Sequence, residues 1–140
     1  MVNRKSVRSA LQFWKRTDTL AQHPLAGLCI VEERRVSAGY ADTSIGRGTA
    51  LRDVLRKAID SLRPGSGQTD YRDDRWRSFI IITEQYVEGQ PSGYVAEELS
   101  IALSTYHHTQ AEALDALAAV LREGQVMTLV EAVADAPVEG

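Results

Sequence analysis

Apolar residues recur three and four positions apart along most of this 140-residue chain, and this spacing constrains its fold more than any other feature. Residues three or four apart lie on one face of an α-helix, whereas a strand places alternate residues on one face. No stretch alternates apolar and polar residues over a convincing strand length. We therefore predict an all-α fold of about six helices, with a helix-turn-helix near the C-terminus.

Residues 1–63 are predicted to form an N-terminal helical part. Its first helix, KSVRSALQFWKR, places Val7, Leu11 and Trp14 on one face. A second helix can begin at Pro24, because proline is tolerated in a first turn. We expect four apolar residues along that helix to be buried: Leu25, Leu28, Cys29 and Val36.

The clearest helix of this first part follows a glycine-containing stretch, residues 37–48, that we interpret as a loop. Thr49 is expected to cap this helix, and Pro64 stops it. Six apolar residues line one side: Leu51, Val54, Leu55, Ala58, Ile59 and Leu62. The preceding GRGT lacks the lysine and the spacing of a phosphate-binding P-loop, so we read it as a plain helix start.

Residues 64–73 are predicted to be a linker, residues 74–123 a three-helix unit, and residues 124–140 an acidic tail with one weak helix. Asp73 or Asp74 is expected to cap the first helix of the unit. Five of its residues are expected to face the core: Trp76, Phe79, Ile80, Thr83 and Val87. The three consecutive isoleucines leave a short strand open as an alternative.

Charge is divided unevenly along the chain. The residues through Arg77 contain fifteen Lys and Arg against nine Asp and Glu, a net charge of +6. From Ser78 onward there is one Arg against ten acidic residues, a net charge of −9, and the two parts together give the overall −3. Such asymmetry bears on the choice of partner rather than on the fold.

The sequence QPSGYVAEELSIALSTY meets the requirements of a helix-turn-helix. Such a motif needs a short helix, a tight turn and a second helix that packs across the first. Ser92 is a suitable cap, and Ile101 can fill the turn. The inner face is predicted to contain Val95, Ala96 and Leu99, and the buried stripe of the long last helix continues through Tyr106, Leu114, Leu117 and Val120.

This stretch, extended from Tyr86 to Leu117, resembles region 4 of bacterial sigma factors and related helix-turn-helix regulators. The family pattern runs from Tyr-x-x-Gly through an Ile-Ala-x-x-Leu-x-Ile-Ser-x-x-Thr-Val core to a long helix ending in Ala-Leu. The matching positions are Tyr86, Gly89, Val95, Ala96, Leu99, Ile101, Thr105, Ala113, Leu114 and Leu117, with Tyr106 at the valine position. The resemblance covers about residues 75–121.

The resemblance implies that the last helix enters the major groove of double-stranded DNA. The family's base-facing positions fall on Leu103, Ser104, His107 and His108, with Gln110 and Ala111 beside them. This chain departs from the family in three ways. Ala102 replaces the usual helix cap, Ser100 replaces the usual glycine of the turn, and histidine and glutamine replace the usual Arg and Lys.

The absence of Lys and Arg between Arg77 and Arg122 argues against DNA binding by this unit alone, because cations supply most non-specific DNA affinity. Three sources of positive charge are open. The histidines can protonate beside DNA, or a partner can supply cations. Basic residues outside the stretch can also hold phosphates: Arg4, Lys5, Arg8, Lys15 and Arg16, or Arg72, Arg75 and Arg77.

Other functional classes are disfavoured. Cys29 lies in an apolar run and is expected to be a buried small hydrophobe. Adjacent histidines on a helix diverge by about 100°, so His107 and His108 are not expected to share a metal ion. No positioned nucleophile, acid or base points to an enzyme, and we expect no cofactor. Without signal-peptide or membrane-helix patterns, we expect a soluble, cytoplasmic protein with no membrane partner.

Two functions follow from the sequence. The first is a small DNA-binding transcriptional regulator resembling sigma region 4, in which Ser104, His107, His108 and Gln110 would contact base edges or phosphates. The second is a helical protein-interaction or signalling module whose degenerate helix-turn-helix no longer binds DNA, and whose acidic C-terminal face holds a basic partner or the basic half of another copy. The apolar stripe of residues 103–122 is explained by the domain core, although a dimer seam would have the same pattern.

Overall fold

The computed structural model describes residues 2–134. These residues form seven α-helices, two short 3-10 turns and one π-helical turn, and they contain no strand, which confirms the all-α prediction. In chain order the elements are α1 (Arg4–Leu11), α2 (Thr17–Gln22), η1 (Pro24–Gly27), α3 (Cys29–Ala38), α4 (Ser44–Asp60), η2 (Asp74–Trp76), α5 (Arg77–Ile82), η3 (Thr83–Val87), α6 (Ser92–Glu98) and α7 (Leu103–Ala134).

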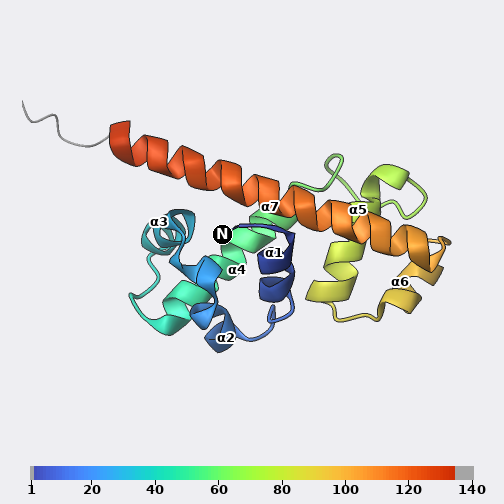
Figure 1. The fold of residues 1–140 in the computed structure, drawn as a ribbon, viewed down its shortest axis with the longest axis horizontal. Coiled ribbons are helices and arrows are strands. Elements are labelled where there is room, and N and C mark those ends of the chain that lie inside the picture. Colours follow the sequence, from blue (N-terminus) through green and yellow to red (C-terminus); the bar gives the residue numbers. More distant parts are fainter. Residues whose placement is uncertain (1, 135–140) are drawn as a thin grey trace, which may run out of the picture.

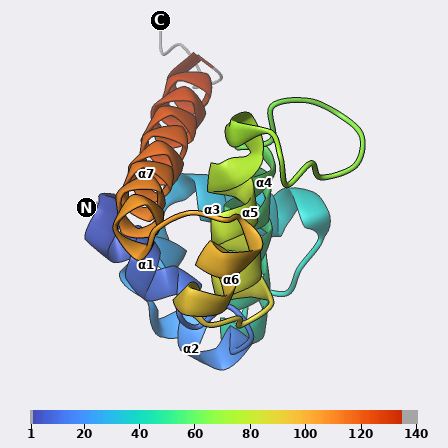
Figure 2. The same cartoon turned by 90° about the vertical axis from the view of Figure 1, so that its right-hand side faces the viewer.

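The long helix α7 organises the molecule. It runs along the longest axis, with α5 and α6 packed against its first turns and α1, α3 and α4 against its middle (Figure 1). The view along α7 shows the other helices gathered on one side of it (Figure 2). Helix α2 packs on α4, away from α7.

Two apolar clusters make the core, and α7 belongs to both. The first joins α1, α2, α3, α4 and α7 and contains Leu11, Leu51, Leu55, Leu114 and Leu117. The second joins η2, α5, α6 and α7 through Trp76, Ile80, Ile81, Val95, Ala96, Leu99 and Tyr106. Complete burial of a Leu or Ile side chain contributes about 1.5–3 kcal/mol, so the shared stripe of α7 binds the two halves of the chain together.

The predicted inner face of the first helix is confirmed, because Val7, Leu11 and Trp14 are buried. The predicted stripe of the next segment is wrong in part. Leu25 is buried, but Cys29 is exposed and Val36 is 63% exposed. Pro24 opens a 3-10 turn that ends at Gly27, and α3 begins afterwards at Cys29. This break resets the helical phase, so that Val31 is the buried residue of α3.

Helix α4 begins earlier than predicted. Thr43 is its cap and accepts a hydrogen bond from the Gly46 amide (3.1 Å). The predicted cap Thr49 lies one turn inside the helix, where its hydroxyl donates to the Ile45 carbonyl (2.8 Å). The predicted loop 37–48 therefore overlaps the first turn of α4. The glycines that suggested a loop instead permit close contacts, since a Cβ at Gly46 would lie 1.9 Å from the Ala41 carbonyl oxygen.

The three isoleucines lie in α5, so the strand alternative is wrong. All three are buried because α5 lies between the two clusters: Ile82 contacts the first, and Ile80 and Ile81 the second. The helix continues as the π-helical turn η3, in which the Glu88 amide donates to the Thr83 carbonyl five residues earlier (3.0 Å). Of the predicted core residues, Trp76 and Ile80 are buried, and Phe79, Thr83 and Val87 are half-buried.

Asp73 caps η2, as the sequence predicts, by accepting from the Arg75 amide (3.0 Å). Ser92 is the first residue of α6 rather than its cap, a position taken by Pro91. The predicted division at residues 123 and 124 falls inside α7, which continues without a break to Ala134. Residues 135–140 of the predicted acidic tail lie outside the described residues.

The close packing of α2 on α4 gives a test of this fold. A Cβ at Gly48 would lie 2.3 Å from the Thr17 carbonyl oxygen. We expect Gly48→Ala to force α2 and α4 apart and lower the free energy of unfolding by about 2 kcal/mol. Gly93→Ala in α6 is the matched control, because no atom lies within 4 Å of the added methyl. We expect Gly93→Ala to raise the free energy of unfolding by about 0.5–1 kcal/mol. Urea unfolding measures both, and equal effects would contradict this packing.

Candidate functional site

The turn between α6 and α7 is closed by backbone hydrogen bonds. The Ser100 amide donates to the Glu97 carbonyl and the Ile101 amide to the Ala96 carbonyl, each at 3.0 Å. This is the pattern of a Schellman C-cap, which requires a left-handed residue at its centre. Ser100 has that conformation, with φ of 56°. The serine that departs from the family pattern therefore has the backbone conformation that glycine adopts most readily.

The predicted inner face is confirmed by burial. Val95, Ala96 and Leu99 are buried, and they share the second cluster with Tyr106, which is fully buried. Ile101 is half-buried and packs against the same cluster. The chain thus turns at the predicted residue, and α6 and the first turns of α7 are joined by an apolar contact.

A buried polar network links α7 to η3. The Gln110 side-chain amide donates to Gln85 Oε1 (2.8 Å) and to the Tyr86 hydroxyl (3.1 Å), and the Tyr106 hydroxyl also donates to Gln85. Gln110 is only 7% exposed. The prediction that Gln110 contacts DNA is therefore wrong, because its side chain faces the interior. Its helical phase, shared with Tyr106 and Leu114, was the signal for burial.

Removing the Gln110 amide tests this structural role. We expect Gln110→Ala to lower the free energy of unfolding by about 1–3 kcal/mol, because it removes the two buried hydrogen bonds to Gln85 and Tyr86. The exposed neighbour Glu112 provides the control, and Glu112→Ala is expected to change stability by no more than about 0.5 kcal/mol. Thermal and urea unfolding of both variants make the comparison. A Gln110→Ala protein as stable as the control would show that the network contributes nothing.

The other predicted residues of α7 form an exposed outer face. Leu103 is 50% exposed, and Ser104, His107 and His108 are exposed beside it. His108 Nε2 lies 2.9 Å from Glu112 Oε1, one turn later. The structure therefore brings these four side chains together on the first two turns of α7, and an acidic residue accompanies them.

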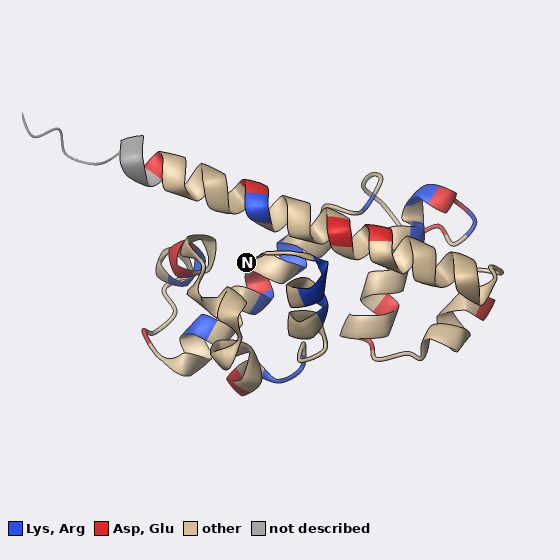
Figure 3. Cartoon of the chain, in the orientation of Figure 1, with Lys and Arg blue, Asp and Glu red and all other residues tan. Residues whose placement is uncertain are grey.

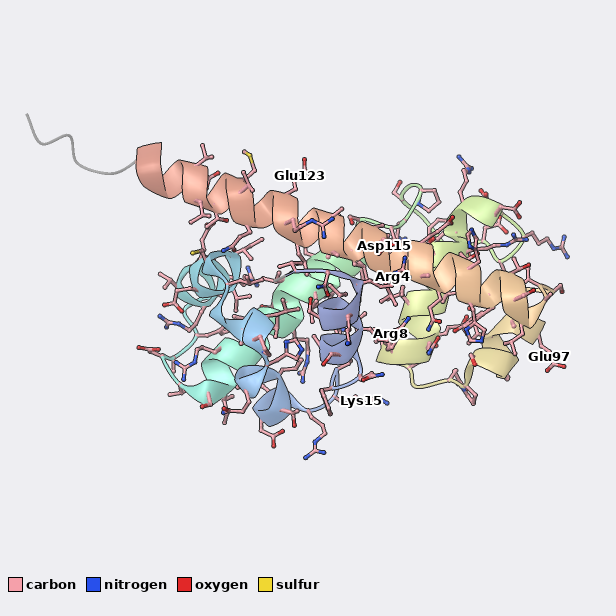
Figure 4. The ribbon with its side chains drawn as sticks, in the orientation of Figure 1. Arg4, Arg8, Lys15, Glu97, Asp115 and Glu123 are labelled. Carbon is pink, nitrogen blue, oxygen red and sulfur yellow. The ribbon has the colours of Figure 1, made fainter. Side chains whose placement is uncertain are left out.

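The preceding helix α6 adds exposed carboxylates and an exposed aromatic ring. Glu97 and Glu98 are exposed near the end of α6, and Tyr94, one turn before them, is 50% exposed. Figure 4 shows Glu97 pointing away from the body of the molecule at the α6 end. Residues 78–121 carry no Lys or Arg. We call the surface formed by Tyr94, Glu97, Glu98, Leu103, Ser104, His107, His108 and Glu112 the α6–α7 face.

Two of the three arginines at residues 72–77 are paired with acidic neighbours. Arg75 pairs with Asp73 (2.7 Å) and Arg77 pairs with Asp74 (3.1 Å), whereas Arg72 is exposed. Figure 3 shows these cations and their acidic neighbours together in the segment around η2, with Asp and Glu on α6 and α7. The predicted group of Arg72, Arg75 and Arg77 thus carries little net positive charge.

Basic residues of α1 and of the loop after it lie beside the C-terminal unit. Arg4 forms a two-point ion pair with Asp115 of α7 (2.9 and 2.6 Å), and Figure 4 shows the two side chains meeting. Burial raises the pKa of Tyr86, and the Arg8 guanidinium beside the Tyr86 hydroxyl offsets part of this rise. Lys15 Nζ would lie 3.8 Å from a Cβ at Gly89, in the loop before α6.

Glu84 is a buried acid that the sequence interpretation missed. It lies in η3, is 7% exposed, and its Oε2 atom has no hydrogen-bond partner among the described residues. Burial raises the pKa of Glu84 to about 7, and the nearby carboxyl group of Glu98 adds to the rise. The position of Glu84, four residues after Ile80 and eight after Trp76, places it on the predicted inner face, so the helical spacing was a signal that could have identified it.

This carboxyl group makes stability depend on pH. The folded pKa of Glu84 lies above its ordinary value of 4.5, so its stabilising contribution is complete below about pH 4.5 and is lost as pH rises through about 7. We expect Glu84→Gln to be more stable than the wild type at pH 8, by about 2 kcal/mol, and equally stable near pH 4.5. Exposed Glu97→Gln is the control. Urea unfolding across this pH range would contradict the assignment if both variants had parallel profiles.

Neither a metal-ligand cluster nor a membrane-spanning helix is found within residues 2–134. No group of three or more His, Cys, Asp or Glu is placed to hold a metal ion. Among the helices described, none combines the length and hydropathy that a bilayer crossing requires. No protein-family model, curated protein or solved structure matches the chain. The resemblance to sigma region 4 therefore stays a prediction from sequence.

Proposed function

We propose that the chain is a protein-interaction module built on a helix-turn-helix scaffold. The observation that carries this proposal is the composition of the α6–α7 face. Tyr94 on α6 and Leu103 on α7 are each 50% exposed, and the other exposed residues of the face include the carboxylates of Glu97, Glu98 and Glu112 but no Lys or Arg. A phosphate-binding surface needs the opposite charge.

The chemistry of the α6–α7 face selects a basic, amphipathic protein segment as the partner. Tyr94, Glu97 and Glu98 share one side of α6, because they are three and four residues apart. Ser104, His108 and Glu112 are similarly aligned on α7. Carboxylates on both helices would attract Lys and Arg of the partner, and the aromatic ring of Tyr94 would supply the buried contact that most often dominates binding energy.

DNA binding is the second candidate, and one observation favours it. Ser104, His107 and His108 are exposed together on the outer side of α7, at positions that the family resemblance assigns to base contacts. Arg8 and Lys15 lie next to the C-terminal unit and would have to supply the phosphate contacts.

One titration series separates the two candidates. The probes are a helical peptide rich in Lys, Arg and Leu and a random-sequence DNA duplex, each titrated at low and at physiological ionic strength. We expect the peptide to bind. The double variant Glu97→Lys/Glu112→Lys should lower the affinity for the peptide about tenfold, because charge reversal replaces attraction by repulsion. Glu33→Lys on α3 is the matched control and should leave the affinity unchanged.

The titration with the DNA duplex tests the second candidate. Duplex affinity near pH 6 that falls steeply with salt, and that is lost in Ser104→Asp and His107→Asp, would establish the second candidate and overturn the first. Peptide binding that Glu97→Lys and Glu112→Lys leave intact would also reject the α6–α7 face as the interaction surface.

A further inference from the structure

The buried carboxyl group of Glu84 is surrounded by acids and hydroxyl groups. Four groups face it: the carboxyl groups of Glu98, on α6, and Glu88, just after η3, and the hydroxyl groups of Tyr71, in the segment before η2, and Tyr106, on α7. No Lys or Arg within residues 2–134 forms an ion pair with it. An ionised carboxylate is costly to bury without a cation or a donor, so the packed structure holds Glu84 as the neutral acid.

Glu84 is connected to helix α6 by its side chain and by its backbone. Glu98, whose carboxyl group faces it, is the last residue of α6. The Gln90 amide, in the loop that leads into α6, donates to the Glu84 carbonyl oxygen (2.8 Å). Helix α6 has only seven residues, and its apolar contact with the second cluster consists of Val95, Ala96 and the adjoining Leu99. Such a short element can open while the rest of the molecule stays folded.

We propose that Glu84 and Glu98 form a pH-sensitive switch for α6: a proton held between their carboxyl groups keeps α6 packed on η3, and ionisation of both groups releases it. With the proton, the O–H of one carboxyl group can donate to the other. Without it, two like charges face each other where water is largely excluded, and their repulsion is strong. Separation of α6 from η3 exposes Glu84 to water, which hydrates the charge.

The pH range of the switch follows from the burial of Glu84. Burial and the Glu98 carboxyl group raise the pKa of Glu84 from 4.5 to about 7 in the packed structure, and exposure to water restores the ordinary value. Packing of α6 is therefore fully stabilised below about pH 4.5 and loses this stabilisation as pH rises through about 7. Tyr71 and Tyr106 stay neutral throughout, because burial raises the pKa of each hydroxyl group.

The switch also controls part of the α6–α7 face. Tyr94, Glu97 and Glu98 of that face are residues of α6. When α6 separates from η3, these side chains no longer have a fixed position beside α7. The face would then be complete at acidic pH and incomplete at alkaline pH. This consequence rests on the proposed function, whereas the switch itself does not.

Amide hydrogen exchange of the full chain tests the switch. The Leu99 amide, which donates to the Val95 carbonyl (3.0 Å), reports on α6, and the amide of buried Leu55 reports on α4. After correction for the intrinsic pH dependence of exchange, protection of Leu99 should fall about a hundredfold from pH 4.5 to 8, since each pKa unit is a factor of ten. Dilute urea should barely change it, because opening of α6 exposes little surface. Leu55 should exchange by global unfolding, which depends strongly on urea.

Three glutamine variants assign the effect to the carboxyl pair. Glu84→Gln should remove most of the pH dependence at Leu99, Glu98→Gln should reduce it, and Glu97→Gln, the matched control on the same helix, should leave it unchanged. A Leu99 amide as sensitive to urea as Leu55 would overturn the proposal, because α6 would then open only with the whole molecule. So would wild-type pH dependence in Glu84→Gln or in Glu98→Gln. Absence of peptide binding would overturn the proposed function and leave these exchange results unaffected.

Discussion

The apolar stripe of α7 is the contact on which the rest of the structure depends. Tyr106 faces the cluster formed with α5 and α6, and Leu114, Leu117 and Leu121 face the cluster formed with the first four helices. Without this helix, apolar residues of both clusters would be exposed to solvent. The two halves of the chain, which differ so strongly in charge, are therefore parts of one folded body. The Arg4–Asp115 ion pair joins them again at the surface, with both side chains about half exposed.

The elements with strong helical periodicity could be predicted from sequence. The buried residues of the first helix, the inner face of α6, the turn at Ile101 and the start of α7 were all found where the spacing of apolar residues placed them. Ser100 is instructive here, because its left-handed backbone follows from the turn and not from its own preference. In each case a local pattern and the packing required the same structure.

The predictions that failed concern positions where tertiary contacts overrode local preference. Glycines 46 and 48 indicated a loop, but they lie in the first turns of α4. They are glycines because neighbouring backbone leaves no room there for a side chain. Gln110 was assigned from a family position, whereas its helical phase buries it. Glu84 was not singled out, although it lies four residues after the predicted core residue Ile80, because a glutamate is rarely buried. The candidate site was thus predictable in its exposed residues and not in its polar interior.

The uninterrupted course of α7 fixes the geometry of anything the protein assembles. Its 32 residues extend for about 48 Å at the standard rise of an α-helix, with the α6–α7 face at one end and the exposed Val126, Met127, Leu129 and Val130 near the other. Because no break interrupts the helix, these two surfaces keep a fixed separation and orientation. A ligand that contacted both at once would need binding elements spaced to match that separation.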